Sequence, residues 1–132
     1  MEQYTLEKGF YVETENKPGV ASQLTSLFGK SGQNIKGIWG SSYDGKGHFA
    51  VITEDWSKAR DALKSSPFSN FKEEEFVVAY VNDKAGSAAE LATKLAKANI
   101  NIKWFYSTYY NGKPALVFSS DNNSKAVETF KH

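Results

Sequence analysis

Two short junctions in the sequence combine residue types that suit a small binding loop. "NKPGV" at 16–20 and "DKAGS" at 83–87 each place a Gly just before a run of residues with helical spacing. Gly has no Cβ, so another molecule can approach the backbone closely there. The first turn of a helix also offers unpaired N–H groups and a partial positive charge, which suit a carboxylate. The alternative is that each junction only starts a helix, with Asn16 or Asp83 as its cap.

Other patterns that could carry chemistry are weak. "GKS" at 29–31 lacks the Gly that a phosphate-binding loop needs five residues earlier, and it lies where a predicted helix ends. The two histidines, His48 and His132, have no partner at metal-ligand spacing, and the chain has no Cys. A Gly-x-Ser-x-Gly nucleophile elbow is also absent. We therefore expect no enzyme activity, no catalytic residue, no metal site and no cofactor.

The segment 45–53 partly matches the aromatic strand of an RNA-recognition motif. Lys46, Gly47 and Val51 fit that pattern, but the residues between them break it. The formal net charge is only +1, so the chain lacks the basic excess that attracts nucleic acid. RNA binding is therefore the least favoured function, and we expect no nucleic-acid partner.

Length and hydropathy favour a folded protein that does not enter membranes. A chain of 132 residues with 40% hydrophobic residues can form one compact domain or two very small ones. The first ten residues contain no apolar stretch of signal-peptide length, and no apolar run approaches the length of a membrane span. We expect a cytoplasmic protein with no membrane partner.

An internal repeat organises the sequence. A shift of 67 residues aligns 10–64 with 77–131 without a gap, and 15 of the 55 aligned positions are identical. Other aligned pairs are physically equivalent. Asp44-Gly45 aligns with Asn111-Gly112, and both dipeptides are typical of tight hairpins. The chain is therefore a tandem duplication.

Each copy predicts the same series of elements, namely strand, helix, strand, strand, helix. One further strand per copy would complete the βαββαβ order of an α+β, ferredoxin-like fold with antiparallel sheets and helices on one face. We predict repeat 1 at 1–70 and repeat 2 at 71–132. The first copy has its last strand near 71–75, which the offset of 67 maps onto 4–8. Residues 3–8 are therefore expected to supply the last strand of repeat 2, the alternative being a frayed N-terminus and a three-stranded second sheet.

The two junctions carry a family likeness. "NKPGVASQLTSLFGKSGQNI" and "DKAGSAAELATKLAKANINI" resemble the opening of the ACT domain, a small effector-binding module, and nearly the whole chain resembles stand-alone proteins with two such domains. The resemblance implies that a small amino acid or related metabolite binds at the strand-to-helix loop, at the interface between repeats. Ala85 and Ser87 depart from the family pattern, so the two sites need not be equal. The ligand-binding residues that the resemblance implies are Asn16, Pro18, Gly19, Val20, Asp83, Ala85, Gly86 and Ser87.

The resemblance also implies a regulatory protein rather than an enzyme. Ligand binding would favour one arrangement of the repeats, which a separate, unknown regulated protein would read. A homodimer is one arrangement in which the repeats could pack. The competing function, from another class, is a structural or protein-interaction module without a ligand.

An aromatic run, "WFYSTYY" at 104–110, is expected to lie on a strand. Alternation would place Trp104, Tyr106 and Tyr110 on one face and Phe105 and Tyr109 on the other. One face must cover the helices, and an exposed apolar face usually marks an interface. Core and interface packing is therefore favoured over an aromatic ligand pocket.

Overall fold

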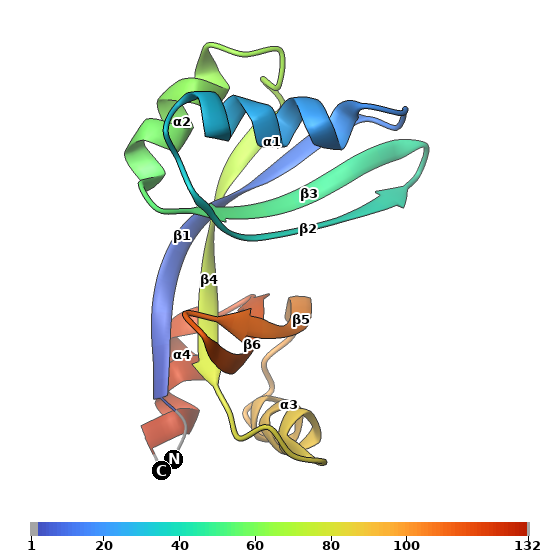
Figure 1. Cartoon of the computed structure of the whole chain (residues 1–132). Helices are drawn as coiled ribbons and strands as arrows, with labels where there is room; N and C mark the ends of the chain where they lie inside the picture. The colour runs from blue at the N-terminus through green and yellow to red at the C-terminus, as the bar shows by residue number, and fades with distance from the viewer. Residues whose placement is uncertain (1–2, 132) are drawn as a thin grey trace. The chain divides into compact units, whose positions relative to one another are not determined.

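The computed structural model describes residues 3–131, so His132 lies outside the described part of the chain. The described residues divide into two compact units. The first unit is Lys8–Glu74, and the second unit consists of 3–7 together with 75–131. Two long strands, coloured blue and yellow-green in Figure 1, run through both units: β1 (Gln3–Glu15) and β4 (Phe71–Tyr80).

The first unit has the order βαββαβ. Between β1 and β4 it contains α1 (Val20–Lys30), β2 (Ile35–Tyr43), β3 (Lys46–Thr53) and α2 (Trp56–Lys64). Its strands lie in the order β2-β3-β1-β4, and β3 pairs antiparallel with both of its neighbours. Both helices lie on the same side of β2 and β3 (Figure 1). The buried core of this unit comprises Phe10, Val12, Leu24, Phe28, Val51, Ala59 and Leu63.

The second unit repeats this arrangement with its first strand taken from β4. It contains α3 (Ser87–Lys97), β5 (Ile102–Tyr110), β6 (Lys113–Ser120), α4 (Asn123–Glu128) and the single 3₁₀ turn η1 (Thr129–Lys131). Its strands lie in the order β1-β4-β6-β5, and β6 pairs antiparallel with β4 and β5. Its core contains Val77, Ala79, Leu91, Leu95, Ile100, Leu116, Phe118, Ala126, Val127 and Phe130. The predicted α+β, ferredoxin-like fold is confirmed.

Local sequence explains the connections. Asp44 and Asn111 adopt left-handed φ values of 54° and 53°, as the predicted two-residue hairpins require. Asp55 and Asn122 cap α2 and α4 by accepting hydrogen bonds from backbone N–H groups three residues on.

The start of the chain lies in the second unit. The ring of Tyr4 is 5.8 Å from that of Phe130, and Glu7 accepts a hydrogen bond from Tyr110 Oη at 3.1 Å. Leu6, which alternation predicts to point inward with Tyr4, is instead 47% exposed. Tyr4 packs against the buried core of the second unit, whereas Leu6 is not among the described residues that do so. Within 3–131, no helix has the length and apolar character needed to span a bilayer.

Candidate functional site

The two strand-to-helix loops, 16–19 (the first loop) and 83–86 (the second loop), have the same backbone geometry at the Gly that starts each helix. Gly19 precedes α1 with φ 90° and ψ −12°, and Gly86 precedes α3 with φ 92° and ψ −11°. A residue with a Cβ is strained at such φ values, which explains why each loop ends in Gly. Neither helix start has a side-chain cap. The interpretation in which Asn16 or Asp83 caps a helix is therefore wrong.

Asn16 and Asp83 instead contact the strand that follows their helix. Asn16 Nδ2 donates a hydrogen bond to Ser42 Oγ at 2.8 Å. Tyr109 Oη donates to Asp83 Oδ2 at 2.7 Å, and this bond raises the pKa of Tyr109. Ser42 and Tyr109 are themselves 67 positions apart, so the two contacts are equivalent in the repeat.

The first turn of each helix presents backbone donors. The Val20 N–H reaches Lys17 O at 3.4 Å, and the Gln23 N–H donates to Gly19 O at 2.9 Å. The N–H groups between them, of Ala21 and Ser22, have no acceptor among residues 3–131. The start of α3 repeats this pattern, with distances of 3.4 and 2.9 Å at Ser87 and Glu90 and open N–H groups on the two alanines between them. Such a helix start attracts a negatively charged group.

A cavity of about 940 Å³, the first cavity, opens beside the first loop. The end of β1, the first loop, one face of α1, the β2–β3 turn and the segment 66–70 line it. The lining includes the α1 residues Val20, Gln23, Leu27 and Lys30, and their spacing places them on a single face of the helix.

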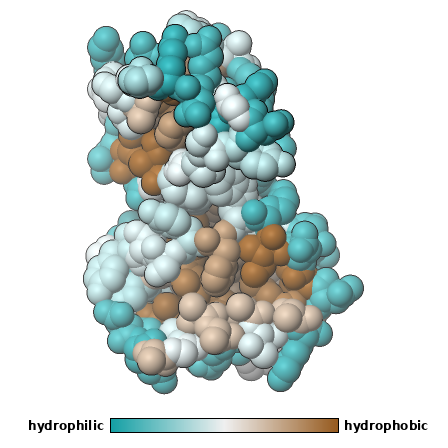
Figure 2. Space-filling view, turned by 90° about the vertical axis from the view of Figure 1, so that its right-hand side faces the viewer, coloured by the Kyte–Doolittle hydropathy of each residue, from teal (hydrophilic) through white to brown (hydrophobic). Residues whose placement is uncertain are grey.

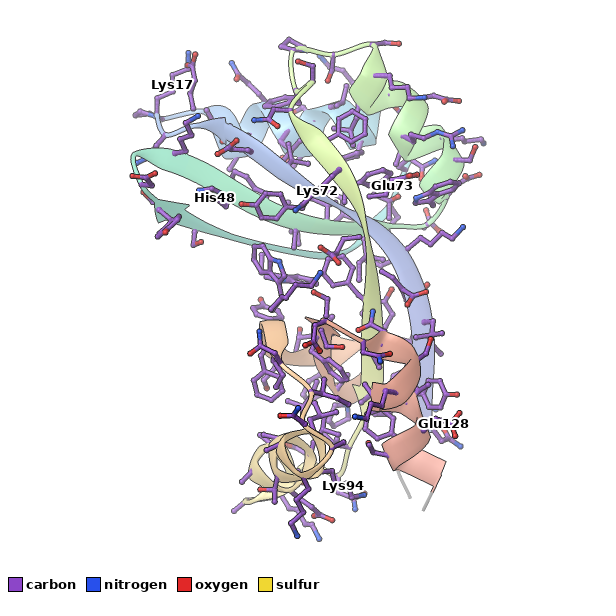
Figure 3. All side chains as sticks on the ribbon, turned by 180° about the vertical axis from the view of Figure 1, so that it is seen from behind. Lys17, His48, Lys72, Glu73, Lys94 and Glu128 are labelled. Atoms are coloured by element: carbon purple, nitrogen blue, oxygen red, sulfur yellow. The ribbon has the colours of Figure 1, made fainter. Side chains whose placement is uncertain are left out.

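The carboxylates of the first cavity are already paired. Lys17 Nζ lies 2.8 Å from Glu15 Oε2, and the hydrogen bond and the charge of Lys17 lower the pKa of Glu15. Glu13 accepts a hydrogen bond from Asn70 at 2.5 Å and lies 3.9 Å from Lys46 Nζ. Figure 3 shows Lys17 projecting at the loop end of the first unit.

A smaller cavity of about 350 Å³, the second cavity, lies at the equivalent position in the second unit. Ser87 and Asn82 line it, and Ser87 Oγ donates to Asn82 O at 2.7 Å. Its charged lining residues are Lys84, Glu90, Lys94 and Lys113. Figure 3 shows Lys94 projecting from α3. Both cavities are thus lined by three lysines, and the second has one carboxylate where the first has two.

Only some of the predicted site residues line these cavities. Asn16 and Val20 line the first, and Ser87 lines the second. The predicted residues that line neither are Pro18, Gly19, Asp83, Ala85 and Gly86. Gly19 and Gly86 supply the left-handed backbone that precedes each helix.

Sequence reasoning missed two contributions to the first cavity. The first is the face of α1 beyond its opening turn, which the helical spacing of Gln23 and Lys30 could have indicated. The second is the segment 66–70, which carries no motif. It lines the cavity because β4, which it precedes, lies next to β1 in the sheet.

His48 lies in a hydrogen-bonded cluster of the first unit. Its Nε2 donates to Tyr43 O at 3.0 Å, so Nδ1 is the acceptor for the Tyr11 hydroxyl. Both ring nitrogens are thus engaged within the protein. Over residues 3–131, no group of three or more His, Asp or Glu side chains is placed to bind a metal ion.

The aromatic run on β5 is divided between core and surface. Tyr110 is 2% exposed, whereas Phe105 and Tyr109 are 43% and 63% exposed. Tyr106 is exposed as well. Figure 2 shows hydrophobic surface, drawn in brown, within the lower part of the view.

Several solved structures share this fold. Protein BT0572 from Bacteroides thetaiotaomicron is 23% identical, with a TM-score of 0.78 over 97% of this chain and 88% of that one. The regulatory subunit of aspartate kinase from Thermus flavus is 11% identical, with a TM-score of 0.70 over 98% and 94%. The same subunit from Thermus thermophilus, in a ligand-free form, is 12% identical, with a TM-score of 0.68 over 98% and 95%. At these identities the likeness concerns the fold. No curated protein matches the sequence.

The repeat, the two βαββαβ units and the paired loops agree with the comparison to protein families. The model of the ACT domain pair matches residues 7–131, which is nearly the whole chain. The resemblance seen in the two junctions is confirmed, and the chain belongs to the ACT domain pair family.

Proposed function

We propose that this protein is a regulatory module that binds a small amino acid or a related metabolite at its strand-to-helix loops. One observation carries the proposal: both loops end in a left-handed Gly that starts a helix without a side-chain cap, next to a cavity. The module has no catalytic role of its own and acts through a separate partner protein. The kinship of its fold with regulatory subunits of aspartate kinase supports this class of function.

The chemistry of the first cavity suits an amino acid. The open N–H groups of Ala21 and Ser22 and the positive end of α1 can receive the α-carboxylate. Asn16 uses its Nδ2 on Ser42, so its carbonyl oxygen is available to accept from the α-ammonium. The rest of the cavity, along α1 and the segment 66–70, leaves room for the ligand's side chain. We still predict that a neighbouring repeat completes the site.

Isothermal titration against the twenty amino acids tests the proposal. We expect one amino acid, or a chemically related group of them, to bind, and Gly19→Val to weaken that binding by at least about tenfold. Gly32→Val is the matched control. Gly32 also has a positive φ of 73°, and an added Cβ would meet no atom within 4 Å, but it lies at the far end of α1. Equal affinity in the two variants would count against the loop as the site.

The competing function is a protein-interaction module without a ligand. The exposed aromatic side chains of β5, Phe105 and Tyr109 among them, are the observation that favours it. The absence of binding heat for all twenty amino acids, together with a change in oligomeric state on replacing Phe105 by Ser, would support this second function.

A further inference from the structure

The contact between each loop and the following strand differs in the second unit. Ser42 is short, and its bond to Asn16 leaves Asn16 on the lining of the first cavity. Tyr109 is long and largely exposed, and it binds Asp83 at the surface. Asp83 does not line the second cavity, although its neighbours Asn82 and Lys84 do.

The two loops agree in backbone at the Gly that starts each helix, but they differ at residue 83, where the Lys84 N–H donates to Asn82 O at 2.9 Å. The φ and ψ values before α1 and α3 agree within 2°. An added Cβ would meet no atom within 4 Å at either Gly19 or Gly86, so neither loop is crowded. The backbone turn around Asp83 and the bond from Tyr109 therefore act together on Asp83, and the side-chain part of this difference is Ser42 against Tyr109.

We propose that Tyr109 is a specificity-determining residue that holds the Asp83 carboxylate out of the second cavity and so makes the two loop sites unequal. This role rests on the proposed function, because Tyr109 would control the affinity of the second loop for its ligand. A ligand's ammonium group meets the Asn16 carbonyl oxygen in the first cavity. Each cavity also has three lysines on its lining, but two carboxylates accompany them in the first cavity and only Glu90 does so in the second.

Removing the phenol hydroxyl should reduce this inequality. Tyr109→Phe keeps the ring and deletes the donor, so Asp83 can turn toward Lys84 and the cavity. The added carboxylate would then offer a charge-assisted acceptor to an ammonium group. The gain should be roughly three- to tenfold in affinity at the second site, the range of one net hydrogen bond.

The experiment is a titration of the ¹⁵N-labelled protein followed by NMR, with the amide signals of Gly19 and Gly86 reporting the two sites separately. The probe is glycine, which has an α-ammonium and an α-carboxylate and no side chain. Acetate, which lacks the ammonium group, is the matched ligand. Tyr43→Phe is the matched variant, because Tyr43 is an exposed tyrosine at a strand end whose hydroxyl makes no hydrogen bond within residues 3–131.

In the unaltered protein, glycine should shift Gly19 at lower concentration than Gly86. Tyr109→Phe should move the Gly86 midpoint three- to tenfold lower for glycine, with no change for acetate, at Gly19, or in Tyr43→Phe. An unchanged Gly86 midpoint while Gly19 still responds would overturn the role of Tyr109 alone. If no amino acid moves either signal, the proposed function fails, and the role of Tyr109 fails with it.

A second measurement reads the contact without a ligand. The bond to Asp83 raises the pKa of Tyr109, so Asp83→Asn should make one tyrosine ionise at lower pH in an ultraviolet titration. Tyr109→Phe should remove that same tyrosine from the titration curve. Identical tyrosine titration in the unaltered protein and in Asp83→Asn would show that the contact does not exist in solution.

Discussion

The two units have nearly the same backbone at the Gly that starts each helix and different chemistry beside it. In nine pairs of residues related by the offset of 67, one member lines the first cavity and the other lines the second. Within these pairs, Leu27 aligns with Lys94, and Glu15 aligns with Asn82. The first cavity therefore combines apolar surface with paired charges, while the second has the same number of lysines, one carboxylate fewer and less apolar surface at these positions. A duplicated loop can keep its geometry through one Gly and still diverge in the groups that select a ligand.

The hairpins differ in a similar way. Tyr43 and Tyr110 occupy equivalent positions at the ends of β2 and β5, but they are 72% and 2% exposed. Tyr110 is buried with its hydroxyl on Glu7, which belongs to the start of the chain. The same residue type is thus buried against a carboxylate in one unit and largely exposed in the other, where its ring lies 5.6 Å from that of His48.

The largest expected effect tests whether the two cores are equivalent. Leu24 and Leu91 are aligned and fully buried, so Leu24→Ala and Leu91→Ala should each lower the free energy of unfolding by about 2–5 kcal/mol. Urea denaturation of both variants measures this. A nearly neutral substitution in one unit would contradict the equivalence of the two cores, because the leucine of that unit would then not be packed as described.

A smaller effect should separate the two hairpin tyrosines. Tyr110→Phe removes a buried hydrogen bond to a carboxylate and should cost about 1.5–3 kcal/mol, while Tyr43→Phe should cost almost nothing. Thermal unfolding of the two variants compares them directly. Equal melting temperatures would show that the Glu7 contact does not stabilise the second unit.

The same contact predicts a dependence on alkaline pH. Burial, and then the Glu7 charge and hydrogen bond, raise the pKa of Tyr110 well above its ordinary value. A raised pKa means that the stabilisation is complete below about pH 10 and is lost as pH rises toward the pKa in the folded state. Stability should therefore fall at high pH in the unaltered protein and fall less in Tyr110→Phe, as urea denaturation across this range would reveal.

Strain at the loops should be equal in the two units. Gly19→Ala and Gly86→Ala place a Cβ on a residue with φ near 90°, which should cost about 1–2 kcal/mol each. Gly29→Ala is the control inside α1, where φ is ordinary and a Cβ meets no atom within 4 Å. We expect that variant to be neutral or slightly more stable. A large difference between the two loop variants in denaturation would contradict their common geometry.

The smallest effect concerns the surface pair beside the first loop. Lys17→Met should return the pKa of Glu15 toward its ordinary value, since Lys17 lowers it through a hydrogen bond and its charge. The sign of the linkage is that a lowered pKa favours the fold above the ordinary value near 4.3 and loses this effect as pH falls, but solvent screening makes the effect of this exposed pair negligible. NMR titration of Glu15 measures the change, and overall stability should stay the same because both side chains are exposed. An unchanged Glu15 titration would mean that the pair does not persist in solution.

Much of the fold follows from sequence alone because its signals are local. Helical spacing, the Asp44-Gly45 and Asn111-Gly112 turns and the offset of 67 residues are properties of short segments, and the structure has the elements that they predict. The offset also maps the residues after 71 onto the start of the chain, and the structure places 3–7 with 75–131. The junctions were enough to indicate the family, since a Gly at the helix start is required by backbone geometry rather than by packing.

Tertiary structure alone decided which side chains the loops present. Asn16 and Asp83 were equivalent in sequence, but the residues opposite them, Ser42 and Tyr109, differ in length and hold them differently. The segment 66–70 lines the first cavity only because β4 lies beside β1. These contacts join residues far apart in the chain, and the direction of a polar side chain depends on the partner that the fold brings to it. The sequence by itself determined the repeat, the turns and the two helix starts, whereas the chemistry of each cavity depended on which strand end met each loop.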